Sequence, residues 1–173
     1  MTPRYEVFGK SPLTNAWGQA NSGGYFGREL KKTGYDAVFF AGVSPRPVYL
    51  LIQDGKSELR DASHLWGKDT VATEQILRDD LGDKSVKVAC IGPSGEALSL
   101  ISCVINDRGR AAGRSGLGAV MGAKRLKAVA VRGHALPAVV HPDKVKTMRR
   151  NYLRSIHESQ DIEENNFKNI GTC

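Results

Sequence analysis

Short runs of strand-forming residues, bounded by turn residues, constrain the fold of this chain more than any other feature. A hairpin is predicted where Asp54-Gly55 separates two such runs. One helix is predicted over residues 71–81, after the capping pair Asp69-Thr70, and another over 142–157. Many strands and few helices predict an α+β fold dominated by mainly antiparallel sheet. The predicted strands are residues 5–8, 37–40, 47–52, 57–60, 87–91, 98–105 and 126–131.

The composition is that of an ordinary globular domain. A chain of 173 residues, of which 40% are hydrophobic and 25% charged, can bury about 70% of its unfolded surface. It has no run of about 18 apolar residues and no signal-peptide pattern, so we expect no membrane partner and a cytoplasmic location. The cysteines are not closely spaced, which predicts neither a disulfide framework nor a Cys-x-x-Cys metal site. Cys90 and Cys103 lie in apolar runs and are expected to be inert core thiols.

Positive charge is concentrated in one stretch of the chain. The net charge is +7, and residues 108–141 contain seven Lys or Arg side chains but no Asp or Glu. No aromatic residue in this stretch could stack on a base, so we expect no nucleic acid partner, although duplex binding through phosphates alone stays open. Glycines alternate with the basic residues from Asn106 to Gly133. Bare backbone beside guanidinium groups favours an anionic, phosphorylated ligand.

The glycines of this stretch do not form a known nucleotide motif. Gly116-Leu117-Gly118 and Gly122 approximate a dinucleotide fingerprint, but the last glycine is one place late and no suitably placed acidic residue follows. Ala123-Lys124 after Gly122 does not complete a P-loop. An alternative is that these glycines only allow close packing of a helix. Lys124 and Lys127, which follow them, are expected on the exposed side of the next helix and strand.

A second glycine loop weakens the packing alternative. Residues 21–27 read Asn-Ser-Gly-Gly-Tyr-Phe-Gly and precede a helical run through Leu30 to Lys32. Both glycine loops therefore lead into a predicted helix, where free N–H groups and the helix dipole favour anions. Two such loops would fit one phosphate-rich ligand.

Five motifs resemble the first domain of the tungsten-containing aldehyde ferredoxin oxidoreductases. They lie at residues 4–14, 20–42, 60–70, 91–96 and 106–133, the last reading NDRGRAAGRSGLGAVMGAKRLKAVAVRG. The resemblance implies a saddle-like platform of two β-sheets under a bis-pterin cofactor of tungsten or molybdenum, with Mg²⁺ joining the pterin phosphates. It implies a tungstopterin-binding domain at 1–134, without the first strands of the family, and a helical segment at 135–173 that leads toward a second domain.

The resemblance also implies site residues. Arg4 matches the arginine between the cofactor and an iron–sulfur cluster, and the Gly23 backbone would approach a pterin. The backbone carbonyls of Asn21 and Ala111 match donors to Mg²⁺, a hard cation that prefers oxygen ligands and phosphates. The phosphate and pterin cradle matches Arg110, Gly113 and Arg114.

The sequence lacks several motifs that carry the chemistry of this family. It contains no Cys-x-x-Cys-x-x-x-Cys run for the cluster, no further pterin motifs and no acid/base residues, so no catalytic residue is assigned, and Cys173 is too isolated to be a cluster ligand. For the complete enzyme, the resemblance implies oxidation of aldehydes to carboxylic acids, with electrons passing through an iron–sulfur cluster to ferredoxin. The alternatives are a non-catalytic module that binds pterin phosphate or another polyanion, and an assembly partner. An apolar face with Trp17, Tyr25 and Phe26 is expected to cause homo-oligomerisation.

Overall fold

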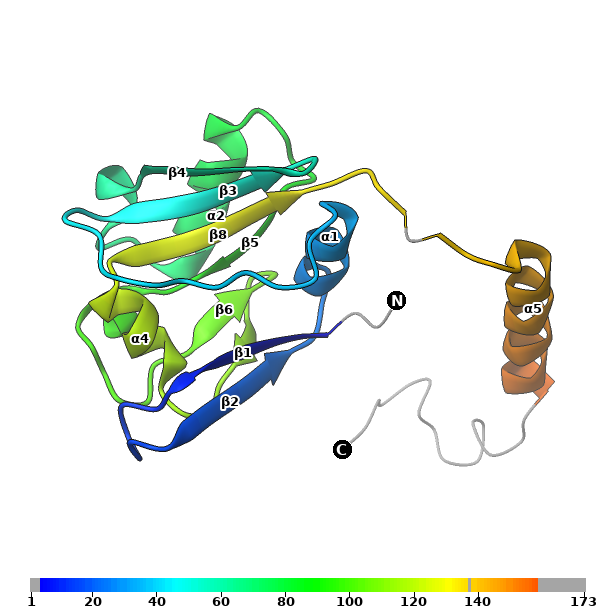
Figure 1. Cartoon of the computed structure of the whole chain (residues 1–173), viewed down its shortest axis with the longest axis horizontal. Coiled ribbons are helices and arrows are strands. Elements are labelled where there is room, and N and C mark those ends of the chain that lie inside the picture. The colour runs from blue at the N-terminus through cyan, green and yellow to red at the C-terminus, as the bar shows by residue number, and fades with distance from the viewer. Residues whose placement is uncertain (1–3, 137, 159–173) are drawn as a thin grey trace. The chain divides into compact units, whose positions relative to one another are not determined.

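The computed structural model describes residues 4–136 and 138–158, which belong to two compact units (Figure 1). The first unit extends to Leu136 and contains all the described strands. The second contains α5 (Pro142–Glu158), none of whose residues is buried. The strands are β1 (Tyr5–Lys10), β2 (Trp17–Ser22), β3 (Val48–Gln53), β4 (Lys56–Asp61), β5 (Lys87–Cys90), β6 (Val104–Asn106), β7 (Arg110–Ala112) and β8 (Leu126–Arg132). The other helices are α1 (Phe26–Lys32), α2 (Thr70–Asp80), α3 (Pro93–Glu96) and α4 (Leu117–Ala123), with a 3-10 turn at Ser63–Leu65.

The strands form two sheets. β1 and β2 make a two-stranded antiparallel sheet, and the other strands make a six-stranded sheet in the order β4-β3-β8-β5-β6-β7. Within the larger sheet, β3 and β8 are parallel and every other neighbouring pair is antiparallel. The predicted α+β fold with two mainly antiparallel sheets is therefore confirmed.

The six-stranded sheet is covered on both faces, which explains its continuous apolar strands. Along β3, Leu50 and Ile52 belong to one core cluster, which also contains Phe26 of α1 and residues of α4. The expected place of Phe26 on an exposed apolar face is therefore wrong, whereas Trp17 and Tyr25 are exposed. The alternate residues Tyr49 and Leu51 belong to a second cluster with Leu77 of α2. Because successive side chains of a strand point to opposite faces, α2 covers one face of the sheet and α1 and α4 cover the other. No helix in the described part of the chain is long and apolar enough to cross a bilayer.

Local signals account for the elements that the sequence predicts well. The β3–β4 turn has positive φ at both Asp54 and Gly55, as a tight hairpin requires. A carboxylate oxygen of Asp69 accepts the N–H of Ala72 at 2.8 Å and caps α2. Gly82 follows this helix with φ +63°. The hairpin and the helix were thus predicted to within a residue or two.

Two predicted strands are wrong in whole or in part. Residues 37–40 form no strand, and Phe39 is exposed. Of residues 98–105, only the end is a strand, because Leu98 takes φ +60° in the loop that leads from α3 to β6. The observed strands β2 and β7 were not predicted. In β2 the buried positions are the small residues Gly18, Ala20 and Ser22, which give no apolar alternation in the sequence.

Candidate anion-binding site

The two-stranded sheet brings the first glycine loop to the β6–β7 hairpin. Ser22, at the end of β2, pairs with Tyr5, so Arg4 and Gly23 lie at the same end of this sheet. In the hairpin, Asn106 pairs with Arg110 across a turn of three residues. β2 and β7 contact each other. Segments separated by more than eighty positions in the sequence therefore meet at one place.

Two guanidinium groups approach the backbone of Gly23. A Cβ atom built on Gly23 would lie 3.5 Å from Nη1 of Arg110 and 3.6 Å from Nη1 of Arg4. Arg4 also donates from Nη2 to the side-chain oxygen of Asn21. Arg4, Asn21 and Arg110 are all exposed. The structure therefore brings together four of the predicted site residues, and this group is called the arginine cluster below: Arg4, Asn21, Gly23 and Arg110.

Gly24 lets the glycine loop pack directly on the hairpin. Its φ is +98°, and a Cβ atom here would lie 2.2 Å from Oδ2 of Asp107 and 2.8 Å from Cδ of Arg110. Any other residue type would be strained at this φ and would have to displace the side chains of Asp107 and Arg110. The close approach of the loop to Arg110 thus depends on this glycine.

Asn106 connects the loop, the hairpin and β1. Its side chain is 1% exposed, and Nδ2 donates to the carbonyl of Gly23 at 2.9 Å and to Oδ2 of Asp107 at 2.8 Å. Oδ1 accepts from the hydroxyl of Tyr5 at 3.0 Å and from Oγ of Ser22 at 2.7 Å. Burial raises the pKa of Tyr5, which keeps this hydroxyl protonated. Sequence analysis missed Asn106, because a single asparagine at a strand end carries no recognisable signal.

The turn of the hairpin is held in an unusual backbone conformation. Asp107 and Arg108 both have positive φ, at 46° and 63°. Oδ2 of Asp107 accepts the backbone N–H of Tyr25 at 2.6 Å, and the N–H of Arg108 donates to Glu74 of α2 at 3.1 Å. These bonds hold the strained turn in place. Asp107 thereby holds Tyr25, the residue that precedes the first turn of α1, while the expected anion binding at this helix start stays a prediction.

The remaining predicted residues follow Arg110 along the chain. Ala111 pairs with Ile105 within the hairpin, in the edge strand β7, and Gly113 and Arg114 come just after this strand. All three predicted residues are exposed. Gly113 is not among the residues with positive φ, so its backbone conformation does not by itself require glycine.

The glycines from Gly116 to Gly122 serve packing. A Cβ atom would lie 2.0 Å from the carbonyl oxygen of Leu100 at Gly116, and 2.0 Å from that of Gly95 at Gly122. At Gly118 it would lie 2.8 Å from the carbonyl oxygen of Cys103. The N–H of Gly118, in the first turn of α4, donates to Ser102 at 3.1 Å. For this part of the stretch the packing alternative is therefore right.

Most basic residues after the glycines bind groups of the chain itself. Lys124 donates to the carbonyl of Gly42 at 3.0 Å, and Arg125 donates to that of Pro45. Lys127 is fully buried and pairs with Glu96, so its predicted exposure is wrong. The reason is its position in β8, which lies between β3 and β5 in a sheet covered on both faces. The exposed basic residues of the stretch are Arg108, Arg110, Arg114 and Arg125, and of these Arg110 lies against the glycine loop.

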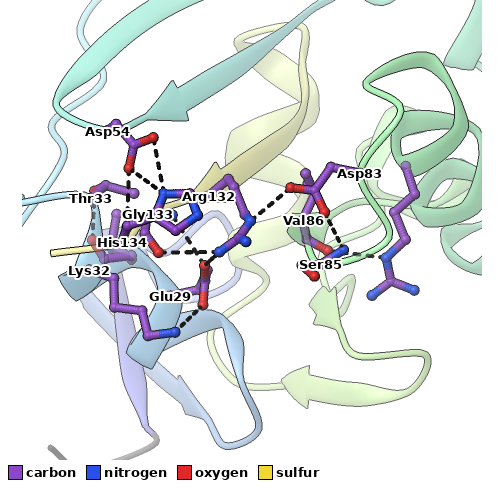
Figure 2. A network of polar contacts seen from close by, with 12 residues as sticks. Glu29, Lys32, Thr33, Asp54, Asp83, Ser85, Val86, Arg132, Gly133 and His134 are labelled. Carbon is purple, nitrogen blue, oxygen red and sulfur yellow. Dashed lines mark hydrogen bonds and ion pairs between the residues drawn. The ribbon is translucent and has the colours of Figure 1, made fainter. Parts of the chain in front are cut away.

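Figure 2 shows a polar network that fixes the end of β8 against α1. Glu29 accepts from Nη1 of Arg132 at 2.9 Å, from the N–H of Gly133 at 3.1 Å and from Lys32 at 3.1 Å. Burial alone would raise the pKa of Glu29, but the hydrogen bonds from Gly133, Arg132 and Lys32 outweigh it and lower this pKa. Nε of Arg132 also donates to Asp83 at 2.8 Å. This group of contacts, which we call the Glu29–Arg132 network, joins α1 to the end of β8.

The side chains of the described residues form no ready metal site. No group of three or more His, Cys, Asp or Glu side chains that could hold an ion occurs in residues 4–136 or 138–158. A metal ion at the arginine cluster would therefore need backbone carbonyls and oxygens of the ligand. The expected roles of Asn21 and Ala111 as backbone donors to Mg²⁺ stay predictions.

The fold and this cluster define a β-rich domain with a basic, glycine-lined surface site. A family model described as "Aldehyde ferredoxin oxidoreductase, N-terminal domain" matches residues 1–133. The chain therefore belongs to the aldehyde ferredoxin oxidoreductase family, and the resemblance seen in its motifs is confirmed.

Individual relatives agree with this family. The tungsten-containing aldehyde ferredoxin oxidoreductase of Pyrococcus furiosus is 52% identical over 88% of this chain and 25% of its own length. The "Aliphatic sulfonate oxidoreductase, WOR-like subunit" of the same organism is 30% identical over 91% of this chain and 27% of its own length. Among solved structures, the active site complex BamBC of benzoyl coenzyme A reductase matches with a TM-score of 0.87 and 38% identity, over 92% of this chain and 24% of that chain. The chain thus spans about a quarter of the length of these relatives.

Proposed function

We propose that the arginine cluster binds the phosphate groups of a tungsten (or molybdenum) bis-pterin cofactor. The observation that carries this proposal is the approach of both guanidinium groups to Gly23. Arginine forms strong, charge-assisted hydrogen bonds with phosphate. A side chain at position 23 would stand beside both groups, so glycine leaves this space to a ligand atom. The residues present fit an anionic group. The names of the tungsten-containing relatives are the reason for proposing that this group is a tungsten–pterin cofactor.

The rest of the cradle is part of the same proposal. The carbonyls of Asn21 and Ala111 would bind a Mg²⁺ ion that joins the pterin phosphates, since this ion keeps oxygen ligands and often shares phosphates with its site. Gly113 and Arg114 would extend the cradle along the exposed chain after β7. In this proposal residues 1–134 are the cofactor-binding domain, and residues 135–173 lead toward a further domain.

The chain's own contribution to the activity would be binding and electrostatics. The metal–pterin group, when bound, supplies the two-electron redox chemistry that oxidises an aldehyde to a carboxylic acid. Arg4 would stabilise the negative charge of the cofactor on the side from which electrons leave toward an iron–sulfur cluster and ferredoxin. No residue of this chain is proposed to be catalytic, and the ligands of the cluster would come from elsewhere in the complete enzyme.

The relatives support a role in cofactor binding rather than in substrate choice. Their names refer to an aldehyde ferredoxin oxidoreductase, an aliphatic sulfonate oxidoreductase and a benzoyl coenzyme A reductase, yet all share this segment. A segment common to enzymes with such different substrates is best explained by the cofactor. Aldehyde is therefore the substrate class proposed from the most similar of these relatives, and homo-oligomerisation stays a prediction.

Calorimetric titration of the chain with inorganic pyrophosphate and Mg²⁺ tests the proposal. Arg110→Ala should weaken binding by about tenfold or more, because it removes a charge-assisted contact worth about 1.5–3 kcal/mol. Arg60→Ala is the matched control, since Arg60 lies in β4, at the opposite edge of the sheet from β7. Equal losses in both variants would mean that pyrophosphate responds only to net charge, and the proposal would be wrong.

A further inference from the structure

We propose that Asn106 is a positioning residue, which holds the first glycine loop and Arg110 in the arrangement that binds one anion. This inference rests on the proposed function of the arginine cluster and assigns a role to a residue outside it. Asn106 contacts the loop through Gly23 and lies directly across the hairpin from Arg110. Its side chain connects the glycine loop to the hairpin that carries Arg110.

The orientation of the Asn106 amide follows from its partners. The carbonyl of Gly23 and the carboxylate of Asp107 can only accept hydrogen bonds, so Nδ2 must face them. Oδ1 then faces Tyr5 and Ser22, whose hydroxyl groups donate. All four hydrogen-bonding positions of the amide are thereby filled. A carboxylate or an apolar side chain of the same size could not satisfy this set of partners.

The loop is fixed on both sides of Gly24. On one side Asn106 holds the carbonyl of Gly23, and on the other Asp107 holds the N–H of Tyr25. Asp107 is itself bonded to Nδ2 of Asn106. Because a Cβ atom at Gly24 would collide with Asp107, the loop sits in direct contact with the turn. A change at Asn106 should therefore move the loop relative to Arg110, although Asn106 is buried and would touch no ligand.

The substitution Asn106→Asp tests this role with little change in shape. The introduced carboxylate would face the carbonyl of Gly23 and the carboxylate of Asp107, and both contacts would become repulsive. Burial and the neighbouring carboxylate would raise the pKa of the introduced group, so it gains a proton on acidification and can then donate one hydrogen bond. Asn15→Asp makes the same chemical change at an exposed residue between β1 and β2, at the other end of the small sheet.

The probe is sulfate, because it stays a dianion where a phosphate monoester would titrate near about pH 6. At about pH 8 we expect Asn106→Asp to bind sulfate about tenfold more weakly than the wild type, and at about pH 5 most of this loss should disappear. Asp107 and Tyr5 are titratable groups bonded to this side chain, and the charged Arg110 lies opposite it in the hairpin. The wild type and Asn15→Asp, measured at both pH values, correct for them.

Each outcome has a defined meaning. If the wild type binds sulfate and Asn106→Asp binds it equally well at about pH 8, the positioning role is wrong while the proposed function stands. A loss of sulfate affinity of equal size at both pH values would also contradict the role. General damage to the fold would not depend on whether the introduced carboxyl group is protonated. If the wild type itself binds no sulfate, the proposed function fails and the inference fails with it.

A milder variant covers the case in which Asn106→Asp does not fold. Tyr5→Phe removes one of the two donors to Oδ1 and leaves the other, Ser22, in place. We expect it to weaken sulfate binding about threefold and to speed hydrogen exchange at the Tyr25 amide, whose acceptor Asp107 belongs to the same set of bonds. Unchanged sulfate affinity and unchanged exchange would overturn the inference.

Discussion

Lys127 and Glu96 form an ion pair in the interior of the protein. Nζ of Lys127 donates to Oε1 of Glu96 and also to the carbonyl of Lys68 at 2.7 Å, and no part of the lysine is exposed. Oε2 of Glu96 accepts the N–H of Gly67 at 2.7 Å. The pair therefore joins β8, α3 and the loop before α2, and its charges are compensated by hydrogen bonds.

The first prediction concerns this pair. Lys127→Met should destabilise the fold by about 3–5 kcal/mol, because it leaves the Glu96 carboxylate buried without its partner. Lys124→Met is the matched control, since Lys124 donates a single hydrogen bond at the surface and should lose less than about 1 kcal/mol. Urea unfolding of both variants measures the difference. If the two variants unfold at the same urea concentration, the buried pair contributes nothing to stability.

Much of the fold could be predicted because its signals are local. The Asp54-Gly55 hairpin and the Asp69 cap of α2 depend on neighbouring residues only. The strand β2 could not be predicted, because its buried residues are small and its pairing with β1 is a tertiary contact. Lys127 was misjudged for a similar reason. The sequence does not reveal that Glu96, thirty-one positions away, lies against the same strand.

The candidate site was predictable in part. The motifs pointed to Arg4, Asn21, Gly23 and Arg110, and the structure brings these four together. The motifs could not separate the glycines that pack α4 from the glycines of the loop, because both kinds occur beside basic residues. The separation depends on which atoms surround each glycine. Asn106 was missed because three of its four partners, Tyr5, Ser22 and Gly23, lie far from it in the sequence.

The second prediction concerns pH and the Glu29–Arg132 network. The pKa values of Glu29 and Asp83 are lowered in the folded state, so their stabilising effect is present above the unfolded pKa of about 4 and is lost as the pH falls through the folded values. Arg132→Met should cost about 1–3 kcal/mol at neutral pH. The stability gap between wild type and variant should shrink below about pH 4, where the carboxylates become protonated.

Thermal unfolding at several pH values measures this gap. Arg60→Met is the control, because Arg60 pairs with Glu58 at the surface and should contribute little at any pH. A gap for Arg132→Met that stays constant from neutral to acidic pH would show that the guanidinium acts through packing and not through the two carboxylates.

The third prediction concerns the thiols. Burial raises the pKa of Cys90 to about 12, so this thiol should resist alkylation in the folded protein. Cys103 is only partly buried, which corrects its expected place in the core, and it should react faster. Peptide mapping after brief treatment with iodoacetamide separates these sites from Cys173, which lies outside the described residues. Equal labelling of Cys90 and Cys103 in the native state would contradict the prediction.

The last prediction separates glycines of the site from glycines of the core. Gly23→Ala places a methyl group at ordinary contact distance from Arg110 and Arg4, so the fold should lose less than about 1 kcal/mol. The same methyl group occupies the space beside both guanidinium groups, so pyrophosphate affinity should fall about tenfold.

Gly122→Ala should do the reverse, with a loss of stability and little loss of affinity. The Cβ atom of the introduced alanine would lie 2.0 Å from the carbonyl oxygen of Gly95, so α3 and α4 must move apart. This movement should cost about 1–3 kcal/mol or more of stability. The residues of the arginine cluster are unchanged in this variant. Urea unfolding and calorimetric titration with Mg²⁺ and pyrophosphate, carried out on both variants, measure the two effects separately. If Gly23→Ala lost stability and kept full affinity, the glycine loop would belong to the packing of the domain, and the proposed site would lose its central residue.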